Sequence, residues 1–199
     1  MDTPSRLVPL LEQFDWACMR LINRMLGPDV DSGNGMPVAV AAMTDDEYLW
    51  EPVPGCWTVR PRPADGSGPG TAAFTVDFAW PEPAPPPVTT IAWRLAHINV
   101  GVLGMRVAGQ FGGAPCSYET YPYPGTAKEA LGQLDSVYHL WISGLRGLSA
   151  DDLGRPCGPS EQYFPDAPLA QLVLHINREM LHHLAEIALL RDLYLWKES

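Results

Sequence analysis

The last part of the chain constrains the fold most, because its apolar residues keep a helical period from about Pro168 to Trp196. This stripe is formed by Leu169, Leu172, Val173, Ile176, Met180, Leu184, Ile187, Leu190 and Leu193. Apolar residues three or four positions apart lie on one face of a helix, and that face must be buried. At about 1.5 Å per residue, such a helix is long enough to run the length of a helical bundle.

Three further segments have the same helical period. They run from about Pro4 to Leu26, from Thr89 or Thr90 to Gln110, and from Thr126 to Leu148. Thr126 and Glu129 have the spacing of a capping box, which marks the start of a helix. Four amphipathic helices joined in this way predict an all-α fold, a four-helix bundle.

A long irregular insert, residues 28–87, separates the first two helices and is rich in proline and glycine. Thr44 and Glu47 form a second capping box and predict a short helical turn. The stretches 57–60 and 74–78 have β-strand character and could pair as a small hairpin. We expect the insert to cover one end of the bundle, and it could act as a lid.

Length and composition favour one domain, residues 1–199, because 199 residues with 46% hydrophobic content suit a single sizeable core. The formal net charge of -10 makes nucleic acid an improbable partner, since acidic surfaces repel phosphates. There is no apolar run long enough to span a membrane. The four cysteines form no CxxC pair, which favours free thiols and a cytoplasmic location.

The last helix contains an unusual group of histidines and glutamates. Glu179 and His183 are four residues apart, so both side chains lie on one helix face and can share a cation. Two ligands from one helix are not enough, and His97, in the middle of the second predicted helix, is the best third donor. These three residues are the predicted ligands of one divalent metal.

Spacing alone leaves other interpretations open. His175 also lies four residues before Glu179, so these two could form the pair instead. His182 and His183 are adjacent and point to two faces, so at most one of them is expected to point inward. Each of these side chains could also be an ordinary surface residue. The stretch from Glu186 to Asp192 is expected to be a solvated face with a weak ion pair.

Two motifs resemble those of the DinB-like superfamily of metalloenzymes. Residues 93–98 (WRLAHI) are similar to its second-helix motif, and residues 177–187 (NREMLHHLAEI) are similar to its last-helix motif. Many members bind the metal with three histidines. Members related to mycothiol-dependent maleylpyruvate isomerase use a His, Glu, His set, which corresponds here to His97, Glu179 and His183. The resemblance makes His182, Glu186 and His175 candidates for residues around the ligands.

The resemblance implies a metal-dependent enzyme. Zinc and nickel both accept this mixture of nitrogen and oxygen ligands. Three protein ligands leave one position open, where mycothiol or a similar thiol could become a thiolate nucleophile. We therefore expect a thiol-dependent transferase or isomerase acting on a small electrophile, as in thiol S-transferases. The alternatives are a metal-dependent hydrolase, with Glu186 or His182 as general base, and a non-enzymatic, stress-associated metal-binding module. The resemblance also implies a homodimer.

Overall fold

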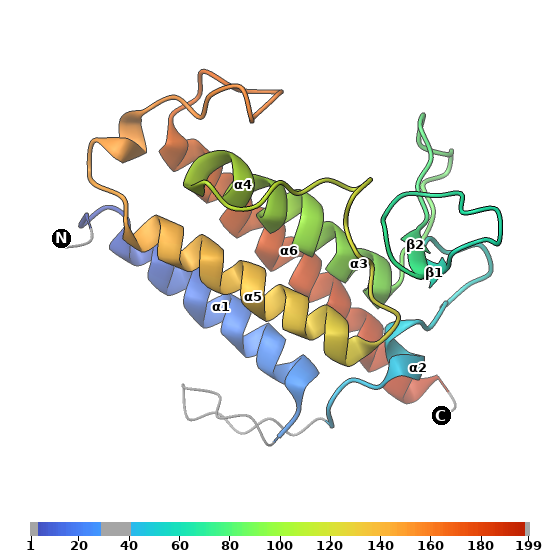
Figure 1. Ribbon diagram of the computed structural model, residues 1–199. Helices are drawn as coiled ribbons and strands as arrows, with labels where there is room; N and C mark the ends of the chain where they lie inside the picture. Colours follow the sequence, from blue (N-terminus) through green and yellow to red (C-terminus); the bar gives the residue numbers. More distant parts are fainter. Residues whose placement is uncertain (1–3, 29–40, 198–199) are drawn as a thin grey trace.

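The computed structural model describes residues 4–28 and 41–197, and it shows a mainly helical chain. The helices are α1 (Val8–Leu26), α2 (Asp45–Tyr48), α3 (Ile91–His97), α4 (Met105–Phe111), α5 (Ala127–Arg146) and α6 (Leu169–Trp196), with the π-helical η1 (Ile98–Gly104) and the 3-10 turn η2 (Asp152–Gly154). The long helices lie side by side, and the continuous rod of α3, η1 and α4 contacts both α5 and α6 (Figure 1). The prediction of an all-α fold is confirmed at this level.

Local side-chain caps fix the starts of two long helices. The Thr90 hydroxyl accepts a hydrogen bond from the Trp93 amide, and the Thr126 hydroxyl accepts one from the Glu129 amide. These bonds satisfy amides that have no partner within the helix. Helix α1 begins later than predicted, at Val8 rather than near Pro4. A later start suits Pro9, whose missing N–H is harmless only in the first turn.

The predicted second helix is interrupted by a π-helical segment directly after His97. The Met105 amide donates to the Val100 carbonyl, five residues back instead of four. Where the backbone changes from this five-residue spacing back to the four-residue spacing of an α-helix, one backbone carbonyl is left without an amide donor. The Gly101 carbonyl lies in this turn and accepts a hydrogen bond from the Arg106 guanidinium. The wide turn therefore also anchors an arginine side chain.

The predicted hairpin in the insert is present as β1 (Val59–Pro61) and β2 (Phe74–Val76), which pair antiparallel with Val59 opposite Val76. Residues 29–40 of the insert lie outside the described residues. The hairpin lies beside the start of α3 (Figure 1). The Trp93 indole on α3 donates to the Asp77 carbonyl over 2.9 Å. This bond ties the insert to the helix that carries His97.

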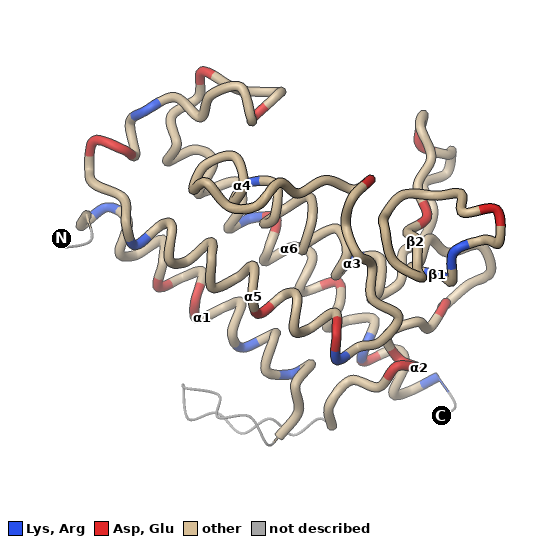
Figure 2. Tube along the Cα trace, in the orientation of Figure 1, with Lys and Arg blue, Asp and Glu red and all other residues tan. Residues whose placement is uncertain are grey.

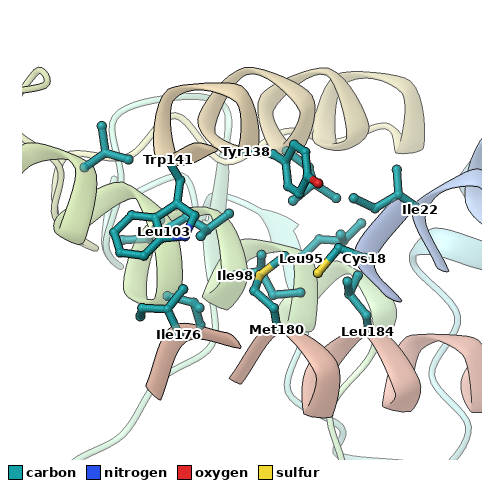
Figure 3. Packing of buried hydrophobic residues seen from close by; sticks show 14 of the residues in the cluster. Cys18, Ile22, Leu95, Ile98, Leu103, Tyr138, Trp141, Ile176, Met180 and Leu184 are labelled. Atoms are coloured by element: carbon teal, nitrogen blue, oxygen red, sulfur yellow. The ribbon is translucent and has the colours of Figure 1, made fainter. Parts of the chain in front are cut away.

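The core lies where α1, α5 and α6 meet the α3–η1 rod (Figure 3). It is filled by large apolar side chains that are almost completely buried: Leu95, Ile98 and Leu103 from the rod, Tyr138 and Trp141 from α5, and Ile176, Met180 and Leu184 from α6. Burying a side chain of this size contributes about 1.5–3 kcal/mol. This packing sets the separation between α3 and α6, which carry the candidate site.

The stretch from Glu186 to Asp192 was expected to be a solvated face, and for Arg191 this expectation is wrong. Its side chain is 1% exposed and is paired with Glu47, which is 3% exposed. One guanidinium nitrogen lies 3.1 Å from the Glu47 carboxylate and 2.9 Å from the Ala41 carbonyl. Another donates to the Arg24 carbonyl at the end of α1. Arg191 thus joins α6 to the end of α1 and to α2.

Among the described residues, none of the helices is both long enough and apolar enough to cross a membrane. Acidic and basic residues are spread over several helices and loops rather than gathered on one element (Figure 2). All four cysteines are free, as the sequence predicted, and three of them are buried.

We predict that Arg191→Met destabilises the protein by about 3–5 kcal/mol, because it leaves Glu47 buried without its partner. The free energy of unfolding, measured by urea titration, checks this. Arg24→Met is the matched control, because it removes only the partly exposed ion pair with Asp192 and should cost less than about 1 kcal/mol. Equal losses in the two variants would contradict the role of Arg191.

Candidate metal centre

His183 lies at the middle of the candidate site. It is 5% exposed, and burial lowers the pKa of its imidazole, so the ring is neutral at neutral pH. Its Nδ1 lies 2.9 Å from Glu186 Oε2 and 3.3 Å from Arg94 Nη1. The carboxylate is nearer than the guanidinium, and a carboxylate can only accept a hydrogen bond from the ring; Arg94 Nε also lies 3.1 Å from Glu186 Oε2 as an ion pair. We therefore assign the proton to Nδ1, donating to Glu186, which leaves a lone pair on Nε2.

That lone pair faces another acceptor. His183 Nε2 lies 3.5 Å from Glu179 Oε2, the carboxylate one turn earlier on α6. Two acceptors at this distance repel each other unless a cation lies between them. Nitrogen and oxygen ligands of a tetrahedral zinc ion are about 3.4 Å apart, given metal–ligand bonds of about 2.1 Å. The pair therefore has the separation that a shared divalent metal requires.

His97 approaches the same place from α3. Its ring is perpendicular to that of His183, with the ring centres 4.7 Å apart. The Trp93 ring stacks on its face at 5.4 Å, and Tyr118 Oη lies 2.7 Å from His97 Nδ1. The Tyr118 contact occupies Nδ1, so Nε2 is the nitrogen that can bind a cation. Burial raises the pKa of Tyr118 to about 12, which keeps its hydroxyl proton in place.

Gly101 allows Tyr118 to come this close. A Cβ atom at position 101 would lie 2.2 Å from Tyr118 Oη and 3.2 Å from His97 Nδ1. Both distances are shorter than ordinary van der Waals contact between heavy atoms. The close contact between η1 and the loop that carries Tyr118 thus depends on a residue without a side chain.

His182 supplies a second possible third donor. One donor atom each from Glu179, His182 and His183 lie within 4.8 Å of one another. His182 is exposed, as expected for the outer member of the adjacent pair, and its Nε2 lies 3.1 Å from Glu186 Oε1. Among the described residues, this is the set whose donor atoms meet that distance, whereas His97 reaches His183 through the ring contact at 4.7 Å.

His175 is occupied by a different partner. Its Nδ1 accepts a hydrogen bond from Arg178 over 2.6 Å, because a guanidinium can only donate. The same Nδ1 is 3.6 Å from Glu179 Oε1, and Arg178 also lies 3.3 Å from that oxygen. The alternative pair of His175 and Glu179 is thus bridged by an arginine, which takes up the lone pair that a metal would need.

A cavity of about 410 Å³ opens beside the site. His97 and Glu179 form part of its wall, together with His175, Arg106 and Glu161. The Arg106 guanidinium lies 3.3 Å from the Glu161 carboxylate, which is 3% exposed. Burial raises the pKa of Glu161, and the nearby arginine opposes that shift. Charged side chains therefore line part of this cavity, which reaches directly to two of the predicted ligands.

Sequence reasoning missed Arg94, Tyr118 and Arg106. Arg94 lies three residues before His97, within the motif that marks the second helix, so helical spacing could have brought it to the site. Tyr118 lies in the loop after α4, where no periodicity predicts a partner. The insert does reach the site, since Trp57 packs 5.9 Å from Trp93, but its action as a lid stays a prediction.

Acid should destabilise the metal-free protein through His97. An unfolded histidine has a pKa of about 6.5. Burial, and after it the charge on His183, lowers the pKa of His97 to about 3. Between these values only the unfolded chain binds the proton, so stability present above pH 6.5 is lost as the pH falls.

We predict that, in a chelator, the wild type loses about 1 kcal/mol more than His97→Gln between pH 6 and pH 5. Urea unfolding at each pH measures this difference. His139→Gln, which changes a histidine on α5 whose side chain is 67% exposed, should keep the wild-type slope. Parallel curves for the wild type and His97→Gln would refute the prediction.

Comparison with known proteins agrees with the two sequence motifs. No curated protein matches the sequence. The sequence profile of the DinB superfamily matches residues 33–187, which include the α3 and α6 motifs and all of the residues around His183. The match covers well over half of the chain, and the chain therefore belongs to the DinB superfamily.

Proposed function

We propose that the site binds one divalent metal, zinc or nickel, through His97, Glu179 and His183. The observation that carries this is the 3.5 Å separation between His183 Nε2 and Glu179 Oε2, because both atoms are acceptors in the tautomer assigned above. His97 is favoured over His182 as the third ligand because it is held from three sides by Trp93, Tyr118 and His183. A preorganised ligand loses less side-chain entropy on binding than an exposed one.

Neighbouring residues would hold these ligands in place. Glu186 accepts the Nδ1 proton of His183 and so directs Nε2 toward Glu179. Tyr118 Oη would accept the Nδ1 proton of His97 in the same way, which leaves His97 Nε2 unprotonated and able to bind the metal. Arg94 lies beside Glu186 and compensates its charge, which keeps the carboxylate from competing for the metal. Glu186 is thus already engaged by three side chains, which disfavours it as the general base of a hydrolase.

The same site supports a thiol-dependent transferase or isomerase. A bound metal would lower the pKa of a coordinated thiol and supply a thiolate nucleophile near neutral pH. The cavity beside Glu179 would admit a hydrophilic thiol such as mycothiol, because Arg106, Glu161 and His175 offer it hydrogen-bonding partners. The second substrate would be a small electrophile that the sulfur attacks.

Metal binding is tested first. We expect the tag-free protein to bind about one zinc ion per chain in calorimetric titration. His97→Ala, Glu179→Ala and His183→Ala should abolish this binding, and mass spectrometry should find no metal in the purified variants. Tyr118→Phe keeps every ligand and should weaken zinc binding about 10- to 100-fold, because His97 loses its orienting partner.

Two controls make this result specific. His139→Ala changes an exposed histidine on α5 and should leave zinc binding unchanged. His182→Ala separates the two possible ligand sets: unchanged binding supports His97 as the third ligand, whereas loss of binding in His182→Ala with retention in His97→Ala would show that our assignment is wrong.

Thiol chemistry is tested with a chlorinated bimane. We expect the zinc-loaded protein to accelerate its reaction with a hydrophilic thiol. The sulfur forms a bond to the bimane carbon, chloride leaves, and the thiol proton passes to solvent. Fluorescence of the thioether measures the rate, and Glu179→Ala should return it to the uncatalysed value. If every thiol tested reacts at the uncatalysed rate, the transferase proposal fails, and ester hydrolysis without thiol would favour the hydrolase.

A further inference from the structure

A second cavity, of about 220 Å³, lies between the insert and α3 and also reaches His97. Its wall includes three aromatic side chains from the insert, Trp57, Phe78 and Trp80, and one from α3, Trp93. It differs in character from the cavity beside Glu179. The residues that line the two cavities are different except for His97 and Tyr118, which border both.

The aromatic rings that line this cavity also contact one another. Trp57 lies 5.9 Å from Trp93 and 6.2 Å from Phe78, with interplanar angles of 34° and 39°. The polar atom of Trp93 is already used, since its indole N–H donates to the Asp77 carbonyl. Trp93 also stacks on His97 with an interplanar angle of 13°. An aromatic ring placed here would lie close to the imidazole of a predicted ligand.

Two of these aromatic side chains are largely exposed to solvent. Phe78 is 67% exposed and Trp80 is 85% exposed. Large exposed apolar groups at a cavity are typical of ligand sites, because their exposure otherwise costs free energy. An apolar cavity of about 150 Å³ is enough to hold benzene. The cavity here therefore has room for one substituted aromatic ring.

The charged residues that line this cavity limit which aromatic groups it can bind. The Asp77 carboxylate is paired with Arg60, with the closest contact at 2.6 Å, so it does not attract a cation strongly. Glu82, which is exposed, is the other acidic residue in the wall. Among the residues that line the cavity there is no lysine or arginine to bind an anion. The lining thus favours a neutral ring over a negatively charged one.

We propose that this aromatic cavity binds a neutral planar aromatic group of the electrophilic substrate, next to His97. The inference rests on the proposed function, because it assigns the two cavities to the two reactants. The hydrophilic thiol enters the cavity beside Glu179, and the aromatic part of the electrophile enters the cavity beside Trp93. Both reactants then meet at His97.

The experiment uses the full chain and 4-fluorobenzyl alcohol, a neutral one-ring probe followed by ¹⁹F NMR. We expect saturable line broadening with the wild type. Trp80→Ala and Phe78→Ala should each weaken binding about 3- to 10-fold, the range for losing one aromatic contact. Both side chains are exposed, so neither variant should unfold the protein, and circular dichroism checks this.

Matched controls decide the result. Trp196→Ala removes another exposed tryptophan, 73% exposed, that does not line this cavity, and it should not change the affinity. Cyclohexylmethanol should displace the probe poorly. The proposal is overturned if the probe does not bind, if Trp196→Ala weakens binding as much as Trp80→Ala, or if tetramethylammonium displaces the probe better than an aromatic competitor does.

Zinc titration of the same samples separates this inference from the proposed function. Probe binding does not need the metal and should be present in chelator. If the probe binds and zinc does not, the metal centre fails, and with it the assignment of the cavity to a substrate of that centre. If zinc binds and the probe does not, only the aromatic cavity is refuted.

Discussion

A guanidinium that is 1% exposed holds three separate parts of the chain together near the end of α6. Arg191 contacts the carbonyls of Arg24 and Ala41 as well as the Glu47 carboxylate. Burying these charges is costly, and only a complete set of partners offsets the cost. The end of α1, the residues before α2 and α2 itself therefore take fixed positions together. The insert continues from α2 to the hairpin, so this contact also helps to determine where Trp57 meets α3.

The cost of burying a charge also determines the protonation of the histidines at the site. His183 and His97 are neutral because burial disfavours their charged forms, and neutral imidazoles are the form that binds metals. The two carboxylates around these histidines have different partners. Glu186 lies among Arg94, His182 and His183, whereas Glu179 turns one oxygen toward Arg178 and the other toward His183. Charge compensation around Glu186 is what leaves Glu179 as the acceptor facing the imidazole.

Features that depend on residues a few positions apart in the sequence could be predicted. Thr90 and Thr126 cap helices through amides three residues ahead, and the period of α6 places Glu179 and His183 on one face. Features that depend on distant partners could not. Arg191 reads as a surface arginine because its partners lie 144 to 167 residues away in the chain. The π-helical segment also escaped prediction, since the apolar period of this stretch is the same as that of an ordinary α-helix and π-helical turns are rare.

The close contact at Gly101 has a consequence for how relatives of this protein can diverge. A methyl group at this position would occupy the space of the Tyr118 hydroxyl, 2.2 Å away. We therefore expect the two positions to covary: a homologue with alanine or serine in place of Gly101 should carry a shorter side chain in place of Tyr118. In such a homologue a different group, or water, would have to hold the histidine nitrogen. Paired changes at these two positions would mark a branch of the family that orients its imidazole by another route.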